Sequence, residues 1–222
     1  MPLARPESLT ALLRVPTLRS VHFRHFSFTP ALFQATANAL VEGTTVTKLE
    51  FKNCSFSAVE CNAMMANALS RDTSVISIVA HQCNNARALC DALVAALPSN
   101  STLRYIELGR QNNDGGQDVF PYLLPLFSAL GQNTGVMTLQ VSACDSMDES
   151  LSAAINNGLE LNETLESLVL DQTHLTDDTA NLWHRAFSFL RTNKALKSLF
   201  VYLETDATES RATTFRFKIV AM

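Results

Sequence analysis

The hydrophobic positions of the chain recur in seven short stretches, each of which starts with an apolar residue. These first positions are Leu18, Val46, Val75, Leu103, Val136, Leu165 and Leu196. They are separated by 28, 29, 28, 33, 29 and 31 residues. Further apolar residues follow three and five positions later, and the positions between them are mostly polar. This alternation predicts a short strand with one buried face in every stretch.

A second pattern, with a spacing of four, precedes each strand. A leucine stands six residues before every first position, and the residues ten and fourteen before it are mostly apolar. The leucines are Leu12, Leu40, Leu69, Leu97, Leu130, Leu159 and Leu190. Residues four apart share one face of a helix, so we expect a helix before each strand. Three residues before the strands stand Gly43, Asn100, Asn133, Asn162 and Asn193. There we expect the left-handed conformation that ends a helix.

The repeating unit is therefore strand, loop, helix and turn, and a single unit cannot bury both its strand and its helix. Stacked units predict an α/β leucine-rich-repeat solenoid, a curved horseshoe with a parallel sheet on the concave face and helices on the convex face. We assign residues 1–222 to one domain. Residues 1–17 form an N-terminal half-repeat or cap helix, 18–195 six repeats, and 196–222 a seventh strand and C-terminal cap. The cap contains an expected strand at Thr213–Val220. The first helix is either a cap or part of a longer array.

One unit matches the signature L-x-x-L-x-L-x-x-N/C-x-L through Leu165, Leu168, Leu170 and Leu175, with Thr173 in the Asn/Cys slot. The other units place Phe26, Cys54, Cys83, Gln111, Cys144 and Glu204 in that slot. With its interval of 28–29 residues, the chain resembles the ribonuclease-inhibitor-like class of leucine-rich repeats. That class includes ribonuclease inhibitors, Ran GTPase-activating proteins and the sensor arrays of NOD-like receptors. The resemblance implies a horseshoe whose inner surface and loops bind another protein.

Composition and charge narrow the partner and the compartment. The chain has 222 residues, 47% of them hydrophobic, without an apolar run long enough to cross a bilayer or a signal-peptide core. Residues 1–111 carry a net charge of +3 and residues 112–222 a net charge of −7. Between Arg110 and Arg185 there are 11 acids and no Lys or Arg. That half repels a phosphate backbone. We expect a cytoplasmic monomer with a protein partner, no nucleic acid and no membrane.

The sequence lacks a recognisable catalytic, cofactor or metal motif. The five cysteines contain no C-x-x-C pair and fall at repeated offsets, as buried fillers do. Cys54 and Cys83 should be stacked neighbours about one strand spacing apart, near 5 Å. No Ser, Cys or acid is placed by the pattern to form a triad, and there is no glycine-rich phosphate loop. We therefore interpret the chain as no enzyme, with no cofactor and no metal. The alternatives are a regulator that acts in trans on a GTPase or another enzyme, and a sensor fragment of a larger receptor.

The polar positions of the strands should line the concave face in three rows, two, four and six residues after each first position. Their charge changes from basic near the N-terminus to acidic towards the C-terminus. The expected partner-binding residues are Arg24, Lys52, His81, Tyr105, Glu166, Asp171, Phe200 and Tyr202. Tyr is frequent among residues that dominate interface energy. The alternative is an ordinary solvated surface. For the acids Asp145, Asp148, Glu149, Asp177 and Asp178 the alternative is a favourable position at a helix N-terminus.

Overall fold

The computed structural model describes residues 5–56, 61–71, 74–84, 87–109, 122–142, 148–174 and 177–204. Within these ranges the main sheet has seven parallel strands in the order β1-β3-β5-β6-β7-β8-β9. The strands are β1 (Ser20–Arg24), β3 (Lys48–Lys52), β5 (Ser77–His81), β6 (Tyr105–Leu108), β7 (Thr138–Ser142), β8 (Ser167–His174) and β9 (Ser198–Glu204). A small second sheet pairs β2 (Ser27–Phe28) with β4 (Ser55–Phe56).

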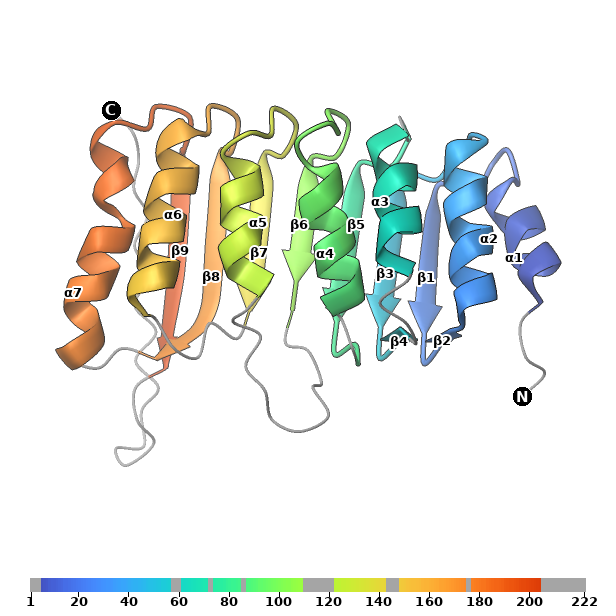
Figure 1. Cartoon of the computed structure of the whole chain (residues 1–222), viewed down its shortest axis with the longest axis horizontal. Coiled ribbons are helices and arrows are strands. Elements are labelled where there is room, and N and C mark those ends of the chain that lie inside the picture. The colour runs from blue at the N-terminus through green and yellow to red at the C-terminus, as the bar shows by residue number, and fades with distance from the viewer. Residues whose placement is uncertain are drawn as a thin grey trace.

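Helices lie along one face of the main sheet (Figure 1). They are α1 (Pro6–Leu13), α2 (Pro30–Val41), α3 (Cys61–Arg71), α4 (Arg87–Ala96), α5 (Leu123–Leu130), α6 (Glu149–Leu161) and α7 (Asp177–Ala186). A short 3-10 helix, η2 (Ser188–Arg191), follows α7. Each helix packs against the next one in the stack. The predicted α/β architecture of leucine-rich-repeat type is confirmed.

The strands keep one register through the whole stack. Leu168 pairs with Leu139 of β7 and Leu199 of β9, and its side chain is fully buried. The equivalent residues are Val21, Leu49, Ile78, Ile106, Leu139, Leu168 and Leu199. In β1 and β3 burial alternates between the helix side and the opposite side, as the sequence predicts. A bulge interrupts β8, where Asp171 and Gln172 stand opposite Tyr202 alone.

Local signals fix where two of the helices begin. The Thr29 hydroxyl accepts a hydrogen bond from the Leu32 N–H at 3.4 Å, and Pro30 opens α2. The Asp148 carboxylate accepts one from the Leu151 N–H at 2.7 Å at the start of α6. Both side chains satisfy backbone donors that a first helical turn leaves without partners. Asp148 therefore lies at a helix N-terminus, the alternative position named for it from the sequence.

Phenylalanines fill the core beneath the first two complete units. The rings of Phe23 and Phe51 stack at 5.4 Å, and those of Phe28 and Phe56 also stack at 5.4 Å. Phe33 of α2 meets Phe28 edge-on at 5.7 Å. These rings repeat from unit to unit, so aromatic contacts join neighbouring units as well as sheet and helix.

The asparagines before the strands form a buried ladder, and the expectation of left-handed helix ends was wrong for them. The Asn133 Nδ2 donates to the carbonyls of Leu97 (2.6 Å) and Asn100 (2.8 Å) in the preceding unit. Its Oδ1 accepts from the N–H groups of Gly135 (2.9 Å) and Val136 (2.7 Å). The same arrangement recurs at Asn162 and Asn193, and in part at Asn100. Of the five positions named from the sequence, only Gly43 has a positive φ, of 95°.

The first helix also departs from the expected leucine register. Leu12 is 46% exposed, whereas Leu13 is fully buried and lies on the same helical face as the buried Leu9. The Leu18 N–H donates to the Val15 carbonyl at 3.0 Å and closes a turn before β1. This connection is one residue shorter than in the later units, which moves the buried leucine from the sixth to the fifth position before the strand.

Several expectations fall on residues outside the described ranges. They include the strand at Thr213–Val220, the slot residues Gln111 and Cys144, and the acid Asp145. Among the described residues, no helix is both long enough and apolar enough to cross a membrane.

Candidate functional site

We use the name open face for the side of the main sheet opposite the helices. It consists of the strand side chains that alternate with the core residues. The first row contains Ser20, Lys48, Ser77, Tyr105, Thr138, Ser167 and Ser198, and the second His22, Glu50, Val79, Glu107, Gln140, Val169 and Phe200. The third contains Arg24, Lys52 and His81 at one end and Ser142 and Asp171 at the other. These registers agree with the rows expected from the sequence.

The first polar cluster of the open face spans β1 and β3. His22 Nδ1 lies 2.9 Å and Lys48 Nζ 3.2 Å from Glu50 Oε2. Ser20 Oγ is 2.9 Å from the other ring nitrogen of His22. Burial acts to raise the pKa of Glu50, but hydrogen bonds from Lys48 and His22 outweigh it and hold the pKa below the usual 4.5. Glu50 therefore stays ionised and neutralises one cation of this region.

The second polar cluster spans β5 and β6. The Tyr105 hydroxyl donates to Glu107 Oε2 at 2.6 Å, and His81 Nε2 is 3.1 Å from Glu107 Oε1. Burial, the hydrogen bond to Glu107 and the charge of Glu107 raise the pKa of Tyr105. Gly109 leaves the space that the His81 ring occupies, because a Cβ at Gly109 would collide with that ring. Glu50 and Glu107 were not among the residues predicted from the sequence to bind a partner, although each stands beside a histidine of the neighbouring unit.

Among the predicted site residues, two cations lie at one end of the open face, and an acid and a tyrosine lie at the other. Arg24 and Lys52 are exposed neighbours in register on β1 and β3, and neither has an ion-pair partner among the described residues. Asp171 pairs with Ser142 and lies in the bulge of β8, opposite Tyr202. The basic side chains thus gather on β1, β3 and β5, about 4.8 Å apart from strand to strand.

Phe200, also selected from the sequence, pairs with Val169 and adds a half-buried aromatic ring beside it.

Of the acids counted between Arg110 and Arg185, Asp171 projects from a described strand. Asp148 and Glu149 lie at the start of α6, and Asp177 and Asp178 at the start of α7. The open face therefore carries less of the acidic charge than the sequence predicts.

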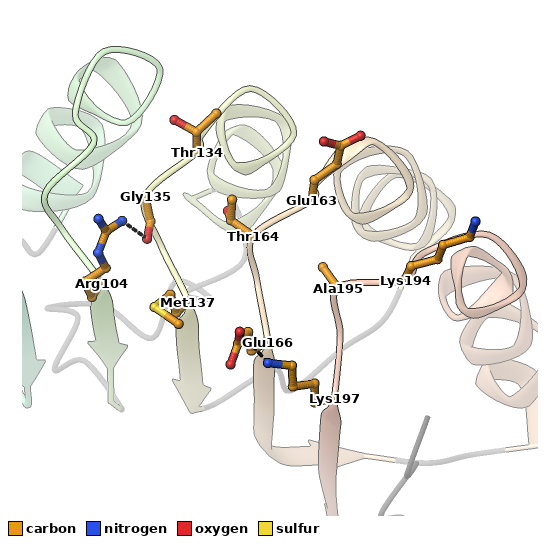
Figure 2. A pocket seen from close by; sticks show the side chains of 10 residues that line it. All are labelled: Arg104, Thr134, Gly135, Met137, Glu163, Thr164, Glu166, Lys194, Ala195 and Lys197. Carbon is orange, nitrogen blue, oxygen red and sulfur yellow. Dashed lines mark hydrogen bonds and ion pairs between the residues drawn. The ribbon is translucent and has the colours of Figure 1, made fainter. Parts of the chain in front are cut away.

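Glu166 does not belong to the open-face rows, and its predicted position on a strand was wrong. It immediately precedes β8 and lies in a groove at the amino-terminal ends of strands β7, β8 and β9 (Figure 2). Its Oε1 is 2.6 Å from Lys197 Nζ. In the same groove the Arg104 guanidinium donates to the Gly135 carbonyl at 2.6 Å. Glu166 stands one residue after Leu165, where the chain has not yet entered the strand.

Cys54, Cys83 and Cys90 are buried thiols of the described part of the chain. Cys54 and Cys83 are neighbours, as expected, since the residues that follow them, Ser55 and Asn84, form a parallel bridge. A hydrogen bond between the two thiols lowers the pKa of Cys54 and raises that of Cys83. Burial raises the pKa of Cys90 to about 12. In the described part of the chain, no group of three His, Cys, Asp or Glu side chains is placed to hold a metal ion.

Comparisons with known proteins give structural similarity without sequence similarity. No protein-family model and no curated protein matches the sequence. The tropomodulin C-terminal domain of Caenorhabditis elegans is similar over 86% of this chain and 93% of that domain, with 11% identity and a TM-score of 0.48. Leiomodin-1 actin-binding site 2 is similar over 84% of this chain and 89% of that chain, with 15% identity and a TM-score of 0.41. Values this low carry no information about the partner of this chain.

Proposed function

We propose that this chain is a non-enzymatic protein-binding module, a single leucine-rich-repeat domain of the ribonuclease-inhibitor-like class, and that its open face contacts the partner. The observation that carries the proposal is the pair of exposed cations Arg24 and Lys52, held in register on neighbouring strands. Like charges directly opposite one another destabilise a sheet. A surface that keeps such a pair, with no ion-pair partner for either cation in the described part of the chain, suits an acidic group supplied by another protein.

The two ends of the open face favour different surfaces on that partner. Near β1 and β3, the Glu50 carboxylate contacts Lys48 and His22, whereas Arg24 and Lys52 have no ion-pair partner among the described residues. Near β7 and β8, the rows contain neutral side chains and Asp171. We therefore expect an acidic patch of the partner to face β1 and β3, and a basic patch to face β7 and β8. Opposed potentials of this kind orient a partner during association more than they hold it afterwards.

Affinity capture with a matched pair of variants tests the proposal. The double variant Arg24→Glu/Lys52→Glu changes the open face. Arg71→Glu/Arg191→Glu changes the same charge at exposed positions on α3 and η2. We expect the open-face variant to lower recovery of the specific partner by about tenfold and the control to leave it unchanged.

The salt dependence of association provides a second readout on the identified partner. Between about 50 and 200 mM salt the screening length falls from roughly 14 to 7 Å. Association of the wild-type chain should slow over this range, and the open-face variant should respond less. Equal behaviour of the two double variants, or association that is insensitive to salt, would contradict binding through the open face.

A further inference from the structure

The first helix, α1, lies beyond β1, the strand at the N-terminal edge of the sheet. Every helix from α2 to α7 follows a strand of the main sheet in its own unit, but α1 precedes β1 and has no such strand among the described residues. β1 pairs with β3 on one side and forms the edge of the sheet. In Figure 1, α1 continues the row of helices past this edge. The position that a strand would take beneath α1 is therefore not filled by a described strand.

A mainly apolar pocket lies at this position. It is lined by Leu9 and Leu12 of α1 and by residues of β1, including Val21 and Phe23. Val21 and Phe23 project to the helix side, whereas His22 and Arg24 project to the open face. The pocket thus continues the core layer of the stack by one strand. Leu12, which is 46% exposed, is the apolar side chain at its rim.

The outward backbone groups of β1 border this pocket and have no strand partner within the described ranges. The Arg19 carbonyl accepts from the N–H groups of Thr47 (2.7 Å) and Lys48 (3.1 Å), and the His25 N–H donates to the Lys52 carbonyl at 3.0 Å. Odd-numbered residues therefore bond to β3. Because successive residues of a strand alternate sides, the N–H and carbonyl groups of the even-numbered residues point to the outer edge. These residues are Ser20, His22 and Arg24.

The charge around this edge defines the chemistry of the strand that fits. Arg24 lines the pocket and is exposed, while Glu50 is held by His22 and Lys48. A strand added in parallel would place every second side chain in the pocket and the others beside His22 and Arg24. Apolar side chains suit the first set, and acidic side chains suit the second.

We propose that the outer edge of β1 is a second binding site, which accepts an extended segment of a partner protein as a parallel strand. The segment alternates apolar residues, packed under Leu9 and Leu12, with acidic residues beside His22 and Arg24. This surface is separate from the contact proposed for the open face, because it uses backbone groups and the pocket below α1. Each proposal can therefore fail without the other.

Direct binding of synthetic peptides to the full chain tests the site. The probe is a blocked ten-residue peptide that alternates valine and glutamate, and a peptide of the same composition with the valines and glutamates in two blocks is its control. We expect saturable binding of the alternating peptide only. His22→Pro removes an outward N–H at an edge position that tolerates proline, and His22→Ala removes the side chain but keeps that N–H. The proline variant should bind at least about tenfold more weakly than the alanine variant.

Two further arms keep the test independent of how well the proline variant folds. Leu12→Asp should abolish peptide binding, while Leu161→Asp, on a leucine of α6 that is 71% exposed, should leave it unchanged. N-methylation of the peptide's valine amides should also abolish binding, whereas N-methylation of its glutamate amides should not, because the apolar residues of a parallel strand donate to β1. Equal binding to both alanine and proline variants, no effect of Leu12→Asp, or self-association of the chain through this edge in sedimentation velocity would overturn the proposal.

Discussion

At the scale of single residues, burial separates the side chains that hold the fold from those available to a partner. Leu168 is fully buried between β7 and β9, whereas its neighbour Ser167 is half-buried on the open face. We expect Leu168→Ala to lower the free energy of unfolding by roughly 2–5 kcal/mol, through lost transfer energy and a residual cavity. Ser167→Ala should change it by about 0.5 kcal/mol or less. Urea denaturation measures both, and similar losses would show that the strand register is wrong.

The carboxylate of Glu50 makes a prediction about acid stability. Its pKa in the folded protein is lower than 4.5, so its contribution to stability is present at neutral pH and is lost as the pH falls through the folded pKa. Glu50→Gln should therefore destabilise the chain at pH 7, and the difference from wild type should shrink below about pH 4.5. Melting temperatures between pH 7 and pH 3 provide the measurement. Glu160→Gln, at an exposed position of α6, is the control.

A difference for Glu50→Gln that stays constant down to pH 3 would contradict the role assigned to this ion pair. The repeat places His22 and Glu50 in the same row but does not predict their contact. The reason is physical: a row fixes which strand positions are neighbours, whereas rotamers and competing partners decide which polar atoms meet.

At the scale of elements, the asparagine ladder joins each turn to the unit before it. Asn133 serves four buried backbone groups, two in its own turn and two in the preceding unit. Replacement by alanine leaves all four without a partner, and we expect Asn133→Ala to cost about 3 kcal/mol or more. Chemical denaturation measures this cost.

Asn193 is the matched control for this prediction. It makes the same four bonds but is half-buried, so water can replace part of them. Asn193→Ala should therefore cost clearly less than Asn133→Ala. Equal losses at the two positions would mean that burial of the ladder contributes little.

The ladder also shows how far the sequence could predict an element. The repeated position of the asparagines was visible, but helix-ending conformations and side-chain bonding both favour asparagine at such a site. The leucine pattern was wrong by one residue in α1, where Leu13 replaces Leu12 in the core, and again in η2, where Phe189 is buried and Leu190 is only half-buried. In the units between them it was right. A buried position predicted from the other repeat units is wrong where the connection between helix and strand has a different length or conformation.

At the scale of the whole molecule, the fold followed from the repeat, while the charge distribution did not. Seven strand starts in a constant relation to seven leucines leave few arrangements other than a stack. The acidic charge, in contrast, was counted along the chain. Asp148 and Glu149 lie at the start of a helix, and Glu166 lies in the groove at the amino-terminal ends of β7 to β9. The count therefore overestimated the acidity of the open face. The surface on which a charged side chain lies depends on its place within the repeat unit, and a count along the sequence does not include that place.

The direction of the ladder has a consequence for how the chain is made. Each asparagine side chain reaches back to carbonyls of the unit that precedes it, as Asn162 does to those of Leu130 and Asn133. On a ribosome the earlier unit emerges first, so the acceptors already stand in place when the next asparagine arrives. The carbonyls exposed at the growing end can meanwhile be solvated by water. The stack is thus suited to assembly one unit at a time during translation, in the same direction as synthesis.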